Sequence, residues 1–349
     1  METIQTRYTP GAAGLLSPLL PWLSDKSVSE ILINKPGEVY VQQGRSMTRH
    51  ALPALDRVHL KRLFTFIANE SNQGICEDTP LLSGNLYDGS RVQLVMPPAA
   101  KDYTLSIRRQ SVKRLSLDDY RHSNFYSQTR PFDMHAPAMD YLSEDDHALM
   151  RLYEAGRWAD FMEAAVHFKK NIVISGATSS GKTTYLNALV GYIPLSERII
   201  TLEDTYEIDI PHPNTVSLCA PKKLSRDEPV VTMQELVQCS LRLRPDRLVM
   251  GEIRGPEVLD FISACSTGHE GSITTIHAQN PRVAFLRMIQ LVRLNNVPSM
   301  RDEDIERLLN EVIDVVIQVN ETPDGRISSW MHYKYAKVTR EGSLACAAH

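Results

Sequence analysis

One stretch constrains this chain more than any other. Between Asn171 and Pro194, an apolar strand pattern, a glycine-rich loop and an amphipathic helix pattern follow one another. Within it, Gly176–Thr183 reads GATSSGKT and matches G-x-x-x-x-G-K-[ST] at every specified position. Glycines let backbone N–H groups close around phosphate oxygens, the helix N-terminus adds partial positive charge, and the lysine adds a full charge. The stretch therefore predicts a site for nucleotide phosphates.

Apolar residues on both sides place this loop between a strand and a helix. Ile172–Ile174 is a short apolar run typical of a buried strand, and Leu186 and Leu189 recur at helical spacing. A glycine turn that binds nothing would not require this context. We therefore expect ATP with Mg²⁺ here, and Thr183 as the side chain that binds the metal. The residues expected to contact the phosphates are Gly176, Ala177, Thr178, Ser179, Ser180, Gly181, Lys182, Thr183 and Thr184.

Length and composition bound the rest of the protein. A chain of 349 residues exceeds the about 250–300 residues at which one hydrophobic core stops growing, so two domains are expected. The net charge of −4 argues against a surface built as a whole for nucleic acid. The 5 cysteines include no C-x-x-C pair, which predicts reduced thiols rather than a zinc or redox centre.

The N-terminal sequence has an apolar patch that does not match a membrane-targeting segment. The patch, Leu15–Leu23, contains Pro18 and Pro21, and it lacks the charged start and small-residue cleavage site of a signal peptide. No run reaches the roughly 18 apolar residues that a spanning helix needs. We therefore expect a cytoplasmic protein, and any association with a membrane surface is expected to be peripheral.

Shifts in composition divide the chain into two domains and a linker. Residues 1–109 mix short strand patterns with a helix pattern, and we expect them to form the smaller, N-terminal domain. Residues 110–139 are polar and irregular, which predicts a linker. Residues 140–349 open with a helical pattern that reaches Phe168, and they then alternate strands with helices. This larger part is expected to form one domain around the glycine-rich loop.

Three short apolar runs after Pro194 predict buried strands that helix patterns separate. The runs cover 199–202, 248–250 and 272–276. Strands that alternate with helices predict a mainly parallel sheet, in which ligands bind at the carboxyl ends of the strands. Pro323–Gly325 then predicts a closing antiparallel hairpin. The expected fold class is α/β.

Three polar residues end these strands or follow them closely. Glu203, Glu252 and His277 should therefore converge at the edge of the sheet that carries the glycine-rich loop. A carboxylate there can hold the water shell of the metal or orient the attacking water, and a histidine can sense the γ-phosphate. The alternatives are solvated loop acids and a histidine that only forms structural hydrogen bonds. The sequence leaves open which carboxylate is the general base.

Two nearby positions refine this expectation. Gly251 stands where many phosphate-loop enzymes have a metal-binding aspartate. We therefore expect Mg²⁺ to be held mainly by Thr183, the phosphates and water, with Glu252 acting through a water molecule. His269 precedes the strand that ends at His277, and for it a structural role and a catalytic role are both open.

Taken together, these motifs resemble those of the hexameric secretion ATPases, and among them the traffic ATPases of type IV secretion and conjugation systems. GATSSGKTT resembles the Walker A box of that family and TLEDTYEI its acidic box. LRLRPDRLVMGEIRG resembles its Walker B box, and STGHEGSITTIHA its histidine box. The order and spacing of the four boxes match between Asn171 and His277.

The resemblance implies a RecA-like C-terminal motor, a smaller α/β (PAS-like) N-terminal domain and nucleotide at the interface between them. It also implies a homohexameric ring on the cytoplasmic face of the inner membrane, with inner-membrane components of the secretion machine, including other ATPases, as partners. GSRVQLVMPP and SIRR match the segments whose arginines reach the nucleotide phosphates in this family, which implies that role for Arg91 and Arg108. The long linker resembles the variant in which the N-terminal domain shifts onto a neighbouring subunit.

The expected function is ATP hydrolysis by a ring motor that energises substrate translocation or pilus assembly. One rival is a nucleotide-gated assembly scaffold with little turnover, and another is a different secretion or pilus ATPase. The four-cysteine module of the type II members and the AIRN-like helix of the pilus-retraction members are not found. A third rival is a helicase-like motor, suggested by Arg242, Arg244 and Arg247, so the sequence leaves direct nucleic-acid binding open.

Overall fold

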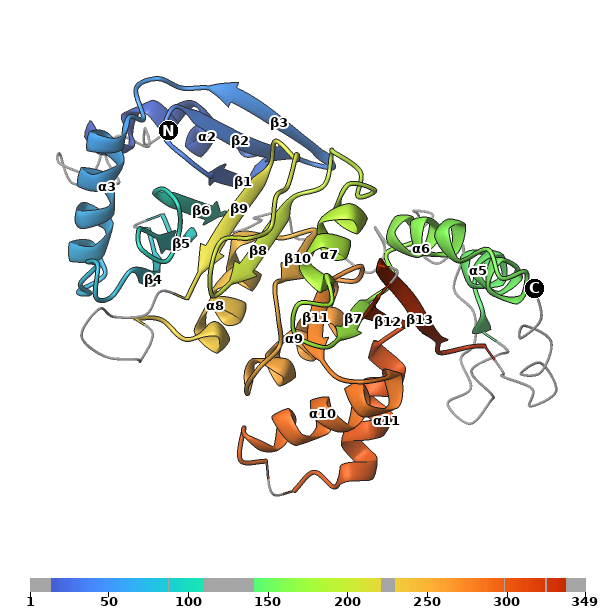
Figure 1. The fold of residues 1–349 in the computed structure, drawn as a ribbon. Helices are drawn as coiled ribbons and strands as arrows, with labels where there is room; N and C mark the ends of the chain where they lie inside the picture. Colours follow the sequence, from blue (N-terminus) through green and yellow to red (C-terminus); the bar gives the residue numbers. More distant parts are fainter. Residues whose placement is uncertain are drawn as a thin grey trace, which may run out of the picture.

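The computed structural model describes residues 14–86, 88–109, 141–220, 230–297, 299–323 and 325–336. These residues form two sheets on which helices pack (Figure 1). The predicted linker, residues 110–139, lies outside the described residues. In chain order the elements are η2 (Ser17–Leu19), α2 (Leu20–Ser24), β1 (Val28–Ile33), β2 (Glu38–Gln43), β3 (Ser46–Ala51), α3 (Arg57–Glu70), β4 (Leu81–Asn85), β5 (Arg91–Val95), β6 (Thr104–Arg108), α5 (Glu144–Glu154), α6 (Trp158–His167), β7 (Ile172–Gly176), α7 (Lys182–Val190), β8 (Ile199–Glu203), β9 (Thr215–Cys219), α8 (Met233–Ser240), η4 (Leu241–Leu243), β10 (Arg247–Met250), α9 (Glu257–Ser266), β11 (Ile273–His277), α10 (Pro281–Arg293), α11 (Asp302–Val312), β12 (Val315–Thr322) and β13 (Gly325–Tyr333).

The first sheet belongs to a small N-terminal domain. Its six antiparallel strands lie in the order β3-β2-β1-β6-β5-β4. β1 and β2 form a hairpin, and α3 is the helix that the pattern within residues 1–109 predicts. α3 begins where the Asp56 carboxylate accepts a hydrogen bond from the backbone N–H of His59. Leu16, Leu19 and Leu23 of the N-terminal apolar patch are buried in the same core as α3, so this patch serves packing.

The second sheet has seven strands in the order β13-β12-β7-β11-β10-β8-β9. All neighbouring pairs are parallel except the β12–β13 hairpin, which confirms the predicted mainly parallel sheet. Alternate residues of a strand face opposite sides. Val173 packs with α8, α9, α10 and α11, whereas Ile172 and Ile174 pack with α5, α6 and α7. Helices therefore cover both faces of the sheet (Figure 1), and the carboxyl ends of its parallel strands meet at one edge.

The structure departs from the sequence prediction in several elements. The helical pattern before Phe168 forms two helices, α5 and α6, because the chain turns at Gly156, whose φ is 65°. β3, β4, β9 and α11 were not predicted. Two later helices begin at capping residues that their sequence shows: Thr232 and Glu235 form a capping box on α8, and the Asn280 side chain caps α10.

The two sheets contact each other through buried polar and apolar groups. Arg198, which directly precedes β8, is fully buried, and its Nη1 donates to Asn34 Oδ1 of the N-terminal domain at 2.6 Å. Asn34 Nδ2 in turn donates to Asn214 Oδ1 at 2.9 Å. The loop between β5 and β6 adds backbone contacts, since the N–H of Cys219 donates to the carbonyl of Ala99 at 2.9 Å. The β5–β6 loop thus lies against the end of β9.

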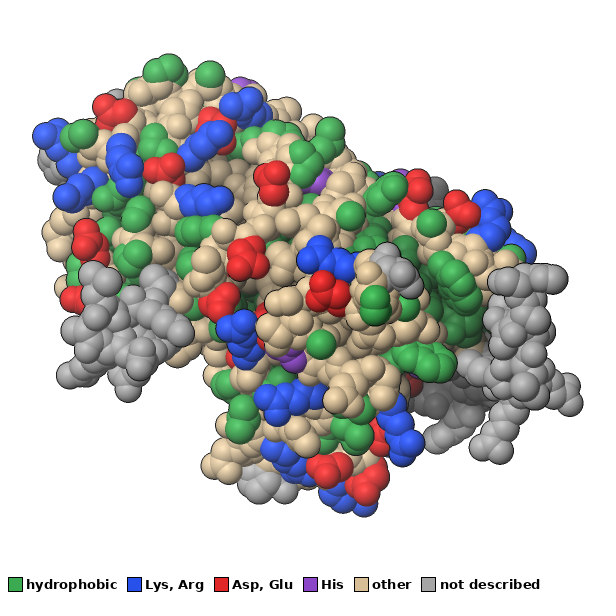
Figure 2. Space-filling model, viewed as in Figure 1, with side chains coloured by type: hydrophobic (Ala, Val, Ile, Leu, Met, Phe, Trp, Pro, Cys, Tyr) green, Lys and Arg blue, Asp and Glu red, His purple; other side chains and the backbone are tan. Residues whose placement is uncertain are grey.

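Two surface features bear on membranes and nucleic acid. Among the described residues, no helix combines the length and the apolar character needed to cross a bilayer. On the face seen in Figure 2, basic and acidic side chains are interspersed, and no extended basic surface stands out there.

The Asp146 side chain links α5 to the second sheet through hydrogen bonds. Its carboxylate accepts hydrogen bonds from Lys170 Nζ at 2.7 Å, from the Tyr333 hydroxyl at 3.0 Å and from Ser143 Oγ at 2.6 Å. Burial alone would raise the pKa of Asp146, but the bonds from Lys170 and Ser143 and the charge of Lys170 outweigh burial and lower it to about 2.

Replacing Asp146 by asparagine should lower the free energy of unfolding at pH 7 by about 2 kcal/mol. A carboxyl with a depressed folded-state pKa stabilises the fold above its unfolded pKa, and this contribution is lost as the pH falls through the folded value. The difference from the wild type should therefore shrink by about half at pH 3, as urea unfolding at both pH values would measure. Asp160→Asn, which loses an exposed pair with Arg157, should change stability little. A difference for Asp146→Asn that is equal at both pH values would contradict this account.

Candidate functional site

The glycine-rich loop closes between the end of β7 and the start of α7. Gly181 has a φ of 93°, a conformation that strains other residues. A Cβ atom on Gly176 would lie 2.5 Å from the Val319 carbonyl oxygen and would also collide with Ser180 Oγ. Ser180 Oγ is buried and has no hydrogen-bond partner among the described residues. A buried hydroxyl without a partner inside such a loop fits a phosphate oxygen as its acceptor.

Lys182 turns its ammonium group back over the loop. Its Nζ donates to the carbonyls of Ala177 at 2.8 Å and Gly176 at 3.2 Å, and to His277 Nδ1 at 3.2 Å. Burial lowers the pKa of Lys182. To reach a phosphate, the ammonium group must exchange these three acceptors for phosphate oxygens.

A chain of side-chain contacts links Lys182 to the end of β10. Because the Lys182 ammonium can only donate, His277 Nδ1 accepts, and Nε2 is then the protonated ring nitrogen. Nε2 lies 3.0 Å from Glu252 Oε1 and can donate to it. Arg254 Nη2 donates to Glu252 Oε2 at 2.9 Å, and Arg254 Nη1 donates to Asp204 Oδ2 at 2.7 Å. The structure thus brings together three predicted residues from three separate elements.

Arg254 and Asp204 are site neighbours that the sequence reasoning missed. Each lies one or two residues from a predicted acid, Glu252 or Glu203, and their opposite charges were the available signal. Spacing alone could not show that two residues 50 positions apart form an ion pair.

Glu203 lies at the end of β8, and its carboxylate accepts hydrogen bonds from the loop that follows the strand. Its Oε2 accepts from the backbone N–H groups of Glu207 at 2.6 Å and Ile208 at 2.8 Å, and Oε1 accepts from Thr201 Oγ1 at 3.0 Å. Burial raises the pKa of Glu203, while these three hydrogen bonds act in the opposite direction. Glu203 is thus buried and hydrogen-bonded, whereas Glu252 bonds to His277.

The N-terminal domain reaches the loop that follows Glu203. Lys101 Nζ lies 4.7 Å from the centre of the Tyr206 ring, within the range of a cation–π contact. The charge of Lys101 also opposes the burial that raises the pKa of Glu203. Lys101 gave no signal in the sequence, because the contact depends on how the β5–β6 loop docks.

Arg91 and Arg108 are not brought to the phosphate loop of their own chain. They are cross-strand neighbours on β5 and β6, and they line a cavity of about 320 Å³ with Arg242, Arg244 and Glu30. The described residues that line this cavity include none from the phosphate loop. Arg244 Nε lies 3.6 Å from Glu30 Oε2, and Arg108 Nε lies 3.8 Å from Glu30 Oε1. Four arginines and one carboxylate therefore line the same cavity at the domain interface.

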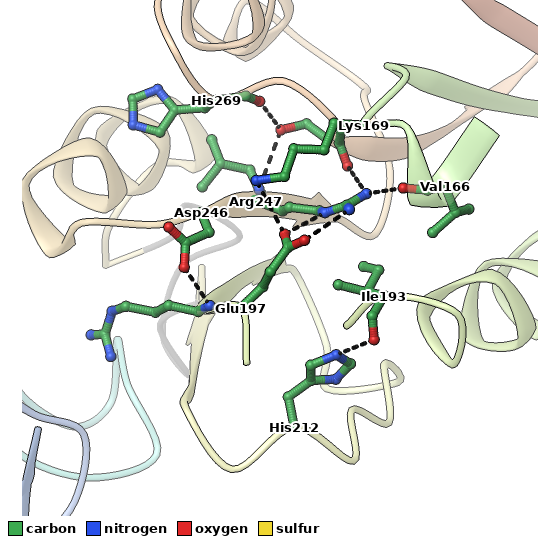
Figure 3. A network of polar contacts seen from close by, with 12 residues as sticks. Val166, Lys169, Ile193, Glu197, His212, Asp246, Arg247 and His269 are labelled. Atoms are coloured by element: carbon green, nitrogen blue, oxygen red, sulfur yellow. Dashed lines mark hydrogen bonds and ion pairs between the residues drawn. The ribbon is translucent and has the colours of Figure 1, made fainter. Parts of the chain in front are cut away.

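His269 and Arg247, whose roles the sequence did not decide, lie at the amino ends of strands in the second sheet. His269 precedes β11, and its Nδ1 lies 3.3 Å from the Ala264 carbonyl oxygen. Arg247, at the start of β10, is fully buried and donates to the Glu197 carboxylate at 2.7 and 3.1 Å and to the Val166 carbonyl at 2.6 Å (Figure 3). Both residues therefore make structural contacts at the amino ends of the strands, away from the loop.

The remaining loop residues are placed where a nucleotide could reach them. Thr183 is partly exposed in the first turn of α7. The described residues contain no group of three or more His, Cys, Asp or Glu side chains that could hold a metal. A hydroxyl that acts together with phosphates and water fits Mg²⁺, which keeps several waters in nucleotide sites. The exposed loop residues are Ala177, Thr178, Ser179 and Thr184.

Comparisons with known proteins place the chain in a family. A model of the family described as "Type II/IV secretion system protein" matches residues 150–334. The chain is 39% identical over 310 residues to the type IV secretion system protein VirB11 of Brucella suis, covering 87% of this chain and 84% of that protein. It is 34% identical over 315 residues to the type IV secretion system protein PtlH of Bordetella pertussis, covering 87% and 88%.

A solved structure extends this likeness to the fold. The crystal structure of the VirB11 ATPase from the Brucella suis type IV secretion system, in complex with sulphate, superposes with a TM-score of 0.85. It shares 36% identity, and the match covers 93% of this chain and 97% of that chain.

A phosphate loop at the carboxyl edge of a mainly parallel sheet, with acids and a histidine on the neighbouring strands, defines a nucleotide-binding RecA-like ATPase. The relatives narrow this class. The chain belongs to the type II/IV secretion system protein family, and within it to the VirB11 ATPases of type IV secretion systems.

Proposed function

We propose that this chain assembles into a six-membered ring on the cytoplasmic face of the inner membrane, where ATP hydrolysis drives a type IV secretion or conjugation machine. Its partners there are inner-membrane components of the machine, including other ATPases. One observation carries the proposal: Lys182, His277 and Glu252 are in direct contact beside the phosphate loop. The membership of the chain in a family of secretion ATPases supports the link to secretion.

In the proposed mechanism, the loop amides, Ser180 Oγ and Lys182 bind the β- and γ-phosphates. Thr183 contributes its hydroxyl to Mg²⁺, which when bound offsets the negative charge of the phosphates. Glu252 orients the attacking water and accepts its proton, since its carboxylate faces the loop through His277. Glu203 keeps the adjacent acidic loop in place through its hydrogen bonds to that loop.

His277 is the proposed sensor of the γ-phosphate. Its ring joins Lys182 to Glu252, so the contacts of His277 must change when Lys182 moves to a phosphate. Loss of the γ-phosphate lets the original contacts return. Such a local change can be amplified into rigid-body movement of the two domains.

Arg91 and Arg108 are proposed to complete the nucleotide site of a neighbouring copy in the ring. Two observations support this assignment. Both arginines line a cavity apart from the phosphate loop of their own chain, and their charges are only partly offset by Glu30. In a heterologous ring, each interface brings a different surface of the next copy to such a cavity, so one site can draw residues from two chains.

A mixing experiment tests the ring and the arginines together. Lys182→Ala chains and Arg91→Ala/Arg108→Ala chains should each lose ATP hydrolysis by about 100-fold or more when assayed alone. An equal mixture, unfolded and refolded together to exchange subunits, should recover about a quarter of the wild-type rate. Half of the chains keep Lys182, and half of their neighbours in the ring keep Arg91 and Arg108. Phosphate release from the mixed and unmixed proteins measures this recovery.

The background control is a mixture of Lys182→Ala chains with Lys182→Ala/Arg91→Ala/Arg108→Ala chains, unfolded and refolded in the same way. No chain in it keeps Lys182, so it should stay inactive. Mixed rings that remain as inactive as the separate variants would contradict a site shared between chains. Size-exclusion chromatography with light scattering, with nucleotide present, checks the six-membered ring independently.

A further inference from the structure

The hairpin formed by β12 and β13 lies beside the phosphate loop. β12 is the parallel neighbour of β7, with Val319 paired with Gly176 at the start of the loop. Past β12 the chain turns and returns as β13, whose second residue is Arg326. A Cβ atom on Gly181 would lie 2.7 Å from Cδ, 2.9 Å from Nε and 3.2 Å from Cζ of Arg326. The Arg326 side chain therefore packs directly on the glycine that precedes Lys182.

The guanidinium of Arg326 has no anionic partner in the part of the chain that the structure describes. Its cross-strand neighbour is Glu321, yet no ion pair or hydrogen bond joins the two side chains. The Arg326 side chain is exposed at this position. It also lies at the N-terminus of α7, where the helix carries partial positive charge, and over the glycine that precedes Lys182. A guanidinium and a helix N-terminus that meet at one point favour an anion as their common ligand.

The strand order decides which part of a nucleotide meets Arg326. β11, β10 and β8 lie on one side of β7, and they carry His277, Glu252 and Glu203 at or just after their carboxyl ends. β12 and β13 lie on the other side of β7. A triphosphate whose γ end faces the acids and the histidine must point its nucleoside end toward the hairpin. Arg326 then lies on the side of the α-phosphate.

We infer that Arg326 binds the α-phosphate of the nucleotide held in the phosphate loop of the same chain. The inference rests on the proposed nucleotide site and adds a binding residue to it from the C-terminal hairpin. It also gives Gly181 a second reason to be glycine, because any side chain there would displace Arg326.

An α-phosphate contact makes a specific prediction about the reaction. ATP and ADP both carry an α-phosphate, so the contact stabilises the substrate, transition-state and product complexes alike. An interaction of this kind lowers KM and leaves kcat unchanged. Arg326 should therefore differ from Lys182 and Glu252, which act on the chemical step.

Binding measured by titration calorimetry tests the inference directly. Arg326→Ala should weaken the binding of ADP and of a non-hydrolysable ATP analogue by a similar factor of about 10, as expected for loss of one charge-assisted hydrogen bond. Its kcat at saturating ATP should stay within about twofold of wild type. Arg326→Lys keeps the charge but not the planar guanidinium group. Its affinity for both nucleotides should lie between those of the wild type and Arg326→Ala. Glu321→Gln, on the opposite strand of the same hairpin, should bind both nucleotides as tightly as wild type.

Any of three results would overturn the inference. The first is that Arg326→Ala binds both nucleotides as tightly as wild type, and the second is that it binds the ATP analogue more weakly and ADP normally. The third is that Glu321→Gln binds both nucleotides as weakly as Arg326→Ala, which would indicate a structural effect of the hairpin. Lys182→Ala in the same assays separates this failure from failure of the proposed site. If Lys182→Ala is inactive while Arg326→Ala binds normally, only the role of Arg326 is wrong. If Lys182→Ala hydrolyses ATP normally, the proposed site itself is wrong, and the inference with it.

Discussion

Replacing Lys182 by alanine is expected to abolish ATP hydrolysis, with a loss of at least about 100- to 1,000-fold in kcat/KM. The ammonium group of Lys182 is the full positive charge that the loop can present to the β- and γ-phosphates, and backbone amides alone supply only partial charges. Steady-state release of phosphate by the purified protein measures the loss.

The variant should remain folded, which makes the result interpretable. In the structure, Lys182 contributes two hydrogen bonds to loop carbonyls and one to His277, so its removal should change the free energy of unfolding by no more than about 1–2 kcal/mol. Lys61→Ala, on the exposed face of α3, is the matched control and should hydrolyse ATP at the wild-type rate. Normal turnover by a folded Lys182→Ala protein would rule out the proposed mechanism.

Glu252→Gln should lower kcat by about 100- to 1,000-fold while nucleotide binding is retained. The amide has the size of the carboxylate, but it cannot take a proton from the attacking water. It also cannot accept hydrogen bonds through both of its terminal atoms, as Glu252 does from His277 and Arg254. Single-turnover hydrolysis, together with calorimetric binding of ADP, separates the chemical step from affinity.

Glu203→Gln provides the comparison that assigns roles to the two acids. A glutamine can accept the hydrogen bonds from Glu207 and Ile208 through its oxygen and donate to Thr201 through its nitrogen, so the acidic loop should keep its shape. We expect Glu203→Gln to retain much more activity than Glu252→Gln. The opposite order would make Glu203 the general base.

Much of the fold followed from local patterns. The strand of the phosphate loop, the parallel strands after it and the helix caps at Thr232 and Asn280 were predictable, because apolar runs and capping residues act over a few neighbouring positions. β3 was missed because its outer position leaves its side chains largely exposed, so its sequence lacks an apolar alternation. β9 is an edge strand of the second sheet. It was missed because its pairing with β8 is a long-range contact without a local signal.

The site was predictable in part for the same reason. Lys182 follows the loop at the end of β7, and Glu252 and His277 lie at or just after the ends of β10 and β11. Parallel strands bring these carboxyl ends together. Arg254 and Lys101 reach their partners through loops whose path depends on packing between elements. The hairpin that places Arg326 on Gly181 was predicted, but not the side of β7 on which it lies.

The chemistry of this protein can be read from its residues in order: a glycine-rich phosphate loop, acids and an imidazole at or just after strand ends, and a motif order that resembles the secretion ATPases. These properties depend on residue type and spacing along one chain. Three further features became visible only in the folded chain. The Glu203 carboxylate bonds to the loop that follows it, Arg91 and Arg108 lie apart from the phosphate loop of their own chain, and the β12–β13 hairpin occupies one particular side of β7. Strand order and domain docking set these distances, and both arise from contacts between residues far apart in sequence, which local patterns do not encode.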